Sequence, residues 1–262
     1  MSRNLKLIIL LAIALTAVLA AFLISPIAQD PNYHHFADQR HILGIPHFWN
    51  VVSNLPLVVV GLLGVRSLIT GSVAGGMPQL RTAYLIIFIG IMLTGLGSSY
   101  YHLNPSNQTL VWDRLPMTFA FMAFFSVIIG ENINITVGRR LLWPLVFSGI
   151  ATVMYWNVTE MRGSGNLAPY ALAQFLPMLL IPLVLILFRS HLSKNVYIWA
   201  VLTAYAMAKV AEHLDKAIFL GLGIISGHTI KHILAALSGY FLFLALHRRR
   251  RTSTTTTVPK VV

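Results

Sequence analysis

The stretch SGHTIKHILAALSGYFLFLALH, residues 226–247, combines a long apolar run with two histidines at one end. A run of about 20 apolar residues is long enough to cross the hydrocarbon core of a bilayer as a helix. Similar runs recur along the chain, since 56% of its 262 residues are hydrophobic and only 10% are charged. The composition therefore indicates an all-α, polytopic membrane protein.

The spacing of these apolar runs predicts eight transmembrane helices joined by short loops. They cover residues 5–25, 48–70, 82–102, 112–131, 140–157, 168–188, 195–213 and 227–247. The first run is too long for the apolar part of a cleaved signal peptide and lacks a small-residue cleavage pattern, so we expect an uncleaved anchor. Four parts follow: an anchor helix at 1–26, an extracytoplasmic loop at 27–47, a seven-helix core at 48–247 and a disordered basic cytoplasmic tail at 248–262.

The net charge of +12 would suggest a nucleic-acid partner in a soluble protein, but here the basic residues gather at alternate helix ends. This basic end of the predicted bundle carries Arg3, Lys6, Arg66, Arg81, Arg139, Arg140, Arg189, Lys194 and Arg248 to Arg251. By the positive-inside rule it is cytoplasmic, and so are both termini. We expect a bilayer and no nucleic acid as the partner, in a bacterial plasma membrane or, alternatively, the endomembrane system. The sequence carries no signal for an oligomeric state.

Five polar residues from three predicted helices fall at the opposite, extracytoplasmic end. They are Ser98, His102, Asp113, His228 and His232. Ionisable residues inside membrane helices are costly and usually mark functional sites. Because residues four apart lie on one helical face, His228 and His232 can approach the same ion, and Ser98 and His102 repeat that spacing. We therefore predict one polar site in the outer half of the bilayer.

The residue types at this site favour metal chemistry. The chain has no cysteine, so thiolate ligands are excluded. Three imidazoles with a fourth position open to water describe a catalytic zinc site, and we predict His102, His228 and His232 as its ligands. Asp113 would carry the proton, and Ser98 would hydrogen-bond a polarised carbonyl or orient the water. Without a metal, the same histidines would form a proton relay or bond to neighbouring helices.

At these residues the chain resembles the alkaline ceramidase family, within the CREST superfamily of seven-helix membrane hydrolases and receptors. The shared motifs are Ser-x-x-x-His at Ser98 and His102, WDRLPM around Asp113, and His-x-x-x-His in HTIKHIL, with a further likeness in FWNVVSNL at 48–55. The likeness spans about residues 48–240. It implies a bacterial-type, zinc-dependent amidohydrolase that cleaves ceramide-like membrane lipids to a fatty acid and a sphingoid base.

Two other functions are weighed against this one. The receptor branch of the same superfamily suggests a seven-helix lipid receptor or sensor in which the zinc is structural. A proton-coupled transporter would need a polar path across the bilayer, whereas the polar groups here stay on one side. A hydrolase is therefore the first expectation, and a receptor is the second.

Two positions depart from the family pattern. In eukaryotic members an acidic N-terminal cluster binds calcium, including a Glu directly before the Phe-x-Asn segment, where this chain has His47. Asp30, Asn32 and Asp38 are candidate oxygen ligands nearby, but we expect a solvated loop or lid there rather than calcium. Arg114 replaces an acidic residue that is common after the motif Asp, and we expect it to pair with Asp113 or with an anionic lipid group.

A second charged group, formed by Lys209, Glu212, Asp215 and Lys216, follows at helical spacing near the same end. We expect salt bridges that complete the helix end, with contact to the lipid headgroup as the alternative.

Overall fold

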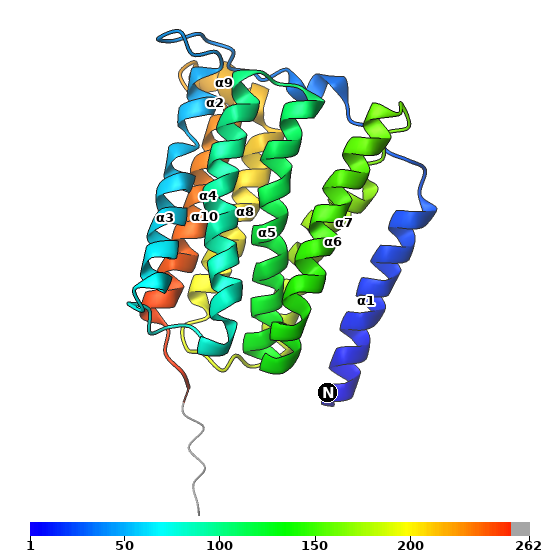
Figure 1. The fold of residues 1–262 in the computed structure, drawn as a ribbon, viewed down its shortest axis with the longest axis vertical. Helices are drawn as coiled ribbons and strands as arrows, with labels where there is room; N and C mark the ends of the chain where they lie inside the picture. Colours follow the sequence, from blue (N-terminus) through cyan, green and yellow to red (C-terminus); the bar gives the residue numbers. More distant parts are fainter. Residues whose placement is uncertain (253–262) are drawn as a thin grey trace, which may run out of the picture.

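The fold is a bundle of long antiparallel helices, seen in a computed structural model that describes residues 1–252 (Figure 1). The helices are α1 (Arg3–Leu23), α2 (Phe48–Val52), α3 (Leu55–Ile69), α4 (Arg81–Leu103), α5 (Asn107–Asn132), α6 (Ile135–Met161), α7 (Ala168–Leu187), α8 (Val196–His213), α9 (Asp215–Leu222) and α10 (Gly227–Arg248). Two short 3-10 helices are η1 (Pro31–His34) and η2 (Pro78–Leu80). The predicted disorder of the tail falls mostly on residues 253–262, outside the described residues.

The all-α, membrane-spanning fold is confirmed. Seven helical segments of the described chain are long and apolar enough to cross a membrane: Arg3–Leu23, Phe48–Ile69, Pro78–Leu103, Asn107–Asn132, Ile135–Met161, Ala168–Leu187 and Gly227–Arg248. The predicted span at 195–213 is the exception: α8 runs with the others through the bundle but is not apolar enough to count as a span, since its last two turns carry Lys209 and Glu212.

Several elements differ from the predicted ones, among them α6, which extends beyond the predicted 140–157 at both ends. The helix expected at 48–70 is interrupted at Ser53 and Asn54, since Pro56 in the first turn of α3 has no N–H to continue the ladder of α2. α5 begins at Asn107 rather than at 112, because Ser106 forms a capping box with Thr109. The short helix α9 was not predicted, and it lies at the same end of the bundle as α2 (Figure 1).

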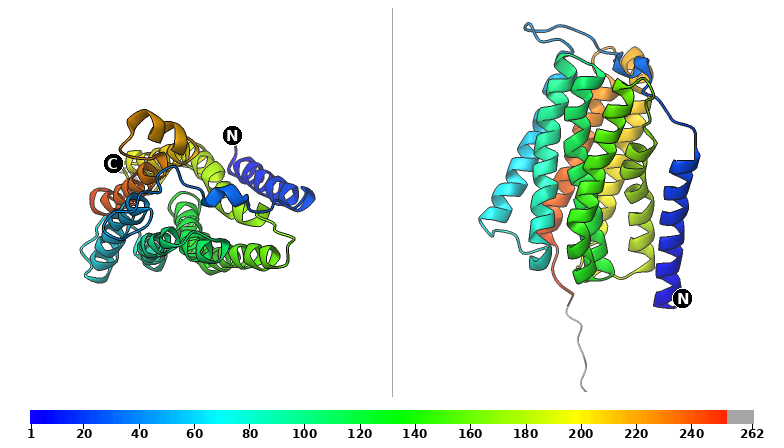
Figure 2. Two further views of the ribbon diagram at one scale, coloured as in Figure 1. Left: turned by 90° about the horizontal axis from the view of Figure 1, so that it is seen from above. Right: turned by 45° about the vertical axis from the view of Figure 1, so that its right-hand side comes forward.

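The packing order of the helices encloses a central space. α3, α4, α5 and α6 pack in succession, α7 contacts α5 and α6, and α10 packs against both α3 and α8. α1 lies at the periphery beside α7 (Figure 2), where the ammonium of Lys6 donates to the carbonyl oxygen of Leu187. α1 therefore packs on the outside of the other long helices and contributes one buried residue, Leu10, to the core.

The two ends of the bundle differ in chemistry. The N-terminus and the end of α10 lie at one end, opposite α2 and α9 (Figure 1). At the terminus end Glu131 accepts from Arg249 at 2.7 Å and from the Tyr84 hydroxyl, and both charged side chains are almost fully buried. This ion pair neutralises Glu131, which lies at the end of the bundle where the basic residues gather. The polar residues predicted to form a site lie at the other end.

Candidate metal centre and adjoining cavity

Three histidines from two helices converge at the end of the bundle that carries α2 and α9. His102 lies in the last turn of α4, while His228 and His232 occupy the first two turns of α10. One ring nitrogen from each lies within 4.8 Å of those of the other two, and the ring centroids are 4.9 to 5.0 Å apart. All three side chains are buried. The structure therefore brings the predicted ligands together.

The hydrogen bonding of this cluster fits a metal ion. Among the described residues, neither ring nitrogen of His102 has a hydrogen-bond partner, although both are buried. A buried polar atom without a partner costs free energy that a bound ligand can offset. Three imidazole nitrogens without a thiolate form a donor set that suits first-row divalent metals. The cluster could thus hold one such ion.

A serine that the sequence analysis did not single out positions one of these histidines. The hydroxyl of Ser53 lies 2.8 Å from Nδ1 of His232, at the interruption between α2 and α3. If Nε2 binds a metal, Nδ1 carries the proton and its N–H donates a hydrogen bond to the hydroxyl oxygen of Ser53. The interruption that Pro56 imposes therefore serves the site, because it turns this hydroxyl toward α10.

Substituting Ser53 by alanine is expected to weaken metal binding by roughly 10- to 100-fold, the usual effect of losing a group that orients a ligand. Titration of the purified protein with a competing chelator measures this affinity. Ser148 on α6 is exposed and donates to the carbonyl of Leu145, so Ser148→Ala is the matched control. An unchanged affinity in Ser53→Ala would show that Ser53 does not orient His232.

The loop before α2 covers the histidine cluster. The ring of Phe36 lies 4.6 Å from those of both His102 and His228. Asp215 joins this loop to α10, because its carboxylate accepts from the backbone N–H groups of Ala37 at 2.9 Å and His228 at 2.7 Å. The loop is thus a packed cover over the site. A solvated loop or lid is expected here from the sequence, and the contacts of Phe36 and Asp215 fit the lid.

The acidic residues that were considered for calcium have protein partners in this loop. Asp30 caps η1 by accepting from the backbone N–H of Asn32. Asp38 pairs with Arg40 at 2.6 Å. Burial alone would raise the pKa of the Asp38 carboxyl, but the hydrogen bonds from Arg40 outweigh it and lower the pKa. Both carboxylates therefore have structural roles in shaping the loop.

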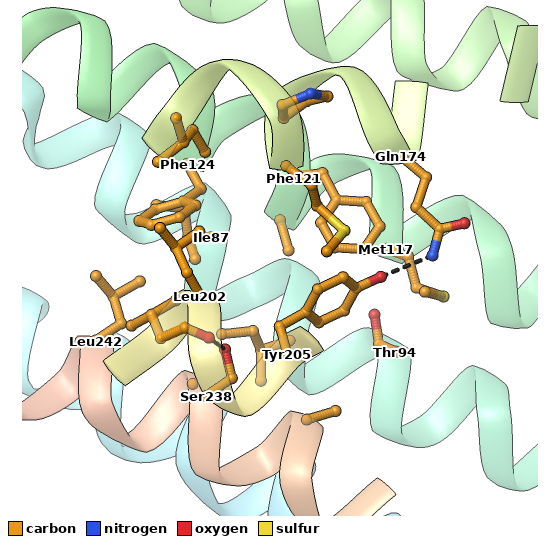
Figure 3. A pocket seen from close by; sticks show the side chains of 18 of the residues that line it. Ile87, Thr94, Met117, Phe121, Phe124, Gln174, Leu202, Tyr205, Ser238 and Leu242 are labelled. Atoms are coloured by element: carbon orange, nitrogen blue, oxygen red, sulfur yellow. Dashed lines mark hydrogen bonds between the residues drawn. The ribbon is translucent and has the colours of Figure 1, made fainter. Parts of the chain in front are cut away.

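A space of about 920 Å³, part of it open to solvent, lies beside the histidines, and we call it the polar cavity because its wall carries charged side chains. Its polar lining includes Ser98, Asp113, Arg114, Lys209, Glu212, Lys231 and His232. Deeper in the bundle lies an apolar cavity of about 820 Å³ (Figure 3), and the two share lining residues such as Thr94, Met117 and Gln174. Where they meet, Gln174 on α7 donates to the hydroxyl of Tyr205 on α8 at 2.7 Å. The polar cavity therefore adjoins an apolar one.

A glycine allows the two predicted catalytic side chains to share this cavity. A Cβ atom on Gly97 would lie 1.9 Å from the carbonyl oxygen of Trp112, so the backbones of α4 and α5 touch here. Only glycine permits such an approach. Ser98 and Asp113, the next residue on each helix, are both buried in the cavity wall.

The charged residues around the cavity are only partly as expected. The salt bridge between Lys209 and Glu212 is present, but the second partner of Glu212 is Lys231 at 2.7 Å. Lys231 also lies 3.4 Å from Nε2 of His228 and was missed in the sequence, although its spacing of three from His228 places it on the same face. Among the described residues Arg114 forms no ion pair, so its expected pairing with Asp113 is not seen.

The chain is similar to known proteins over most of the segment that carries this site. The family model described as Ceramidase matches residues 38–260. Alkaline ceramidase 3 of Mus musculus is 24% identical over 120 residues, which is 45% of this chain and 42% of the relative. A putative alkaline ceramidase of Dictyostelium discoideum is 24% identical over 99 residues, 34% of each chain.

The chain spans less than half the length of either relative. The family model, by contrast, extends from the covering loop past the end of α10 and includes the three histidines, Ser98 and Asp113. The resemblance that the sequence motifs indicated is thereby confirmed, and the chain belongs to the ceramidase family.

Proposed function

We propose that this protein is a zinc-dependent amidohydrolase that cleaves the N-acyl bond of ceramide-like lipids to a fatty acid and a sphingoid base. The observation that carries the proposal is the buried histidine cluster beside a cavity that is polar near Asp113 and apolar deeper in the bundle. Membership of the ceramidase family and the names of the two relatives support the choice of an amide-linked lipid.

The metal ligands in this proposal are His102, His228 and His232. Zinc is the favoured ion because imidazole nitrogens are among its usual ligands and three protein ligands are typical of catalytic zinc sites. When bound there, zinc would act as a Lewis acid and would lower the pKa of a water molecule toward neutrality. Ser53 holds His232 in the required tautomer, and the ring of Phe36 shields the cluster from the aqueous side.

Asp113 and Ser98 carry out the proton transfer and the polarisation. The carboxylate of Asp113 takes a proton from the attacking water while the oxygen of that water bonds to the amide carbon. The hydroxyl of Ser98 donates a hydrogen bond to the carbonyl oxygen, where negative charge develops. Asp113 then delivers the proton to the amide nitrogen as the carbon–nitrogen bond breaks, which yields a free amine and a fatty acid.

The apolar cavity offers space for one hydrocarbon chain of the substrate. Its walls are formed by Ile87, Phe121, Phe124, Leu202 and Leu242, among others (Figure 3). The chain would pass from the bilayer into an equally apolar space, so the cavity would select the shape and length of the chain by packing rather than by hydrophobic driving force. The scissile amide then lies where the two cavities meet.

The proposed site faces the extracytoplasmic side of the membrane. Basic residues gather at the opposite end of the bundle, which the positive-inside rule assigns to the cytoplasm. Residues 1–26 are the anchor and residues 48–247 the catalytic core in this arrangement, and we propose a bacterial plasma membrane as its location.

The direct test is hydrolysis of a ceramide by the purified protein, with zinc measured by elemental analysis. We expect fatty acid release, its loss on treatment with a strong chelator, and its return when zinc is added back. Protein that retains zinc and binds ceramide without turnover would instead be a lipid receptor with a structural metal. Full activity after complete metal removal would overturn the proposed chemistry.

A further inference from the structure

A buried arginine in the wall of the polar cavity has a donor without a partner. Arg114 is 6% exposed, and among the described residues its Nη1 atom forms no hydrogen bond. Its other terminal nitrogen, Nη2, donates to the side-chain oxygen of Gln29 at 2.7 Å. An ionised side chain in such a place is costly unless a counter-charge or hydrogen bonds satisfy it.

The guanidinium is held rigidly by its surroundings. Its central carbon lies 4.3 Å from the ring centroid of Trp156, 4.9 Å from that of Tyr170 and 5.5 Å from that of Tyr33. Cation–π contacts of this kind stabilise the charge without neutralising it. Arg114 is therefore fixed in position, positively charged, and still able to donate toward a ligand.

The other charged groups of the cavity leave a positive balance. Lys209 and Lys231 both pair with the single carboxylate of Glu212. Together with Arg114 and Asp113, the cavity is lined by three basic and two acidic side chains. Both lysines already pair with Glu212, and Asp113 is the proposed proton carrier. Arg114, which pairs with neither carboxylate, is therefore the cation best placed to bind an anion from a ligand.

We propose that Arg114 forms a subsite for the anionic headgroup, a phosphate or carboxylate, of the lipid substrate. This inference rests on the proposed function and narrows it, because the preferred substrate becomes an N-acyl lipid with a negative charge close to its amide. A guanidinium recognises phosphate and carboxylate through its N–H donors, and Nη1 of Arg114, which has no partner in the described part of the chain, is free to donate in this way. Lys231 adds positive charge beside the reacting groups.

The first experiment compares kcat/KM for ceramide phosphate with that for the unphosphorylated ceramide of the same chains. The wild type is expected to prefer the phosphorylated lipid, and Arg114→Gln is expected to lower this preference by roughly 10- to 100-fold, the range for losing a hydrogen bond to a charged group. Arg162 is exposed at the end of α6 on the same side of the bundle, so Arg162→Gln is the matched control and should keep the preference. If Arg114→Gln does not fold, Arg114→Lys takes its place. An ammonium keeps the charge but cannot reproduce the parallel N–H donors of the guanidinium, so this variant should still show a reduced preference.

The second experiment needs no turnover, so it separates this inference from the proposed function. Equilibrium binding of dodecyl phosphate is compared with that of dodecanol. We expect the wild type to bind dodecyl phosphate at least about 10-fold more tightly than dodecanol, and Arg114→Gln to lose this preference. Equal binding of the two lipids by the wild type would overturn the subsite, whatever the outcome with ceramide. A preference for dodecyl phosphate without hydrolysis of any N-acyl lipid would support the subsite and overturn the proposed function.

Two further arms identify the source of the anion. Inorganic phosphate should not displace dodecyl phosphate at equal concentration, and equally tight binding of the two would show a free-anion site instead of a headgroup subsite. If Arg114→Gln weakens inhibition by the fatty acid product but keeps the preference for ceramide phosphate, Arg114 holds the released carboxylate and the headgroup proposal falls.

Discussion

Substituting His232 by alanine is expected to remove the bound metal and the hydrolytic activity together. His232 supplies one of three imidazoles whose nitrogens converge within 4.8 Å, and two histidines do not complete a tetrahedral site with one open position. Loss of a ligand should exceed the roughly 10- to 100-fold effect of losing a group that orients one. We therefore expect less than about 0.1 zinc per chain by elemental analysis at micromolar protein, and no measurable fatty acid release.

The matched control for this substitution is His213→Ala. His213 is exposed at the end of α8, on the same side of the bundle, and lies outside the histidine cluster. It should keep both zinc and turnover. Retention of zinc and activity by His232→Ala, with an unchanged melting temperature, would contradict the assignment of His232 as a ligand.

Substituting Asp113 by asparagine is expected to separate metal binding from catalysis. Asparagine has nearly the same shape as aspartate but cannot take a proton from water, so the zinc content should stay at that of the wild type. General acid–base catalysis typically contributes 10²- to 10⁴-fold, and we expect kcat to fall by about that factor. The measurements are single-turnover fatty acid release and elemental analysis on the same preparation.

Asp30→Asn is the control for charge removal at the same end of the bundle. Asp30 is exposed and caps η1, a role that asparagine can also fill. Its turnover should therefore match the wild type. If Asp113→Asn retained the wild-type kcat, Asp113 would not be the proton carrier, whereas loss of zinc from this variant would make it a metal ligand instead.

The helical fold was predictable because a bilayer imposes one dominant pattern on the sequence. Apolar runs of the required length located α1, α4, α7 and α10 to within a few residues. The interruption at Ser53 and Asn54 was missed, since the apolar run continues through it. α9 was missed because an eight-residue helix beside a longer one gives no separate hydropathy signal.

The convergence of the site residues was also predictable, because alternating helix directions bring His102, Asp113 and His228 to one depth. What the spacing could not show is which other side chains fill the gaps between the helices. Phe36 comes from an irregular loop, and Ser53 from a helix interruption. The surroundings of Arg114 depend on contacts with Gln29 and Trp156, which are remote in sequence and follow no periodic rule.

The contact of Gly97 with the Trp112 carbonyl makes the spacing between Ser98 and Asp113 sensitive to substitution at position 97. Side-chain packing can often relax by a few tenths of an ångström, whereas here the main chains of α4 and α5 are in direct contact. Any residue larger than glycine at this point would wedge the helices apart and move the acid relative to the hydroxyl. The relative position of Ser98 and Asp113 thus depends on the lack of a Cβ atom at Gly97, the residue before Ser98.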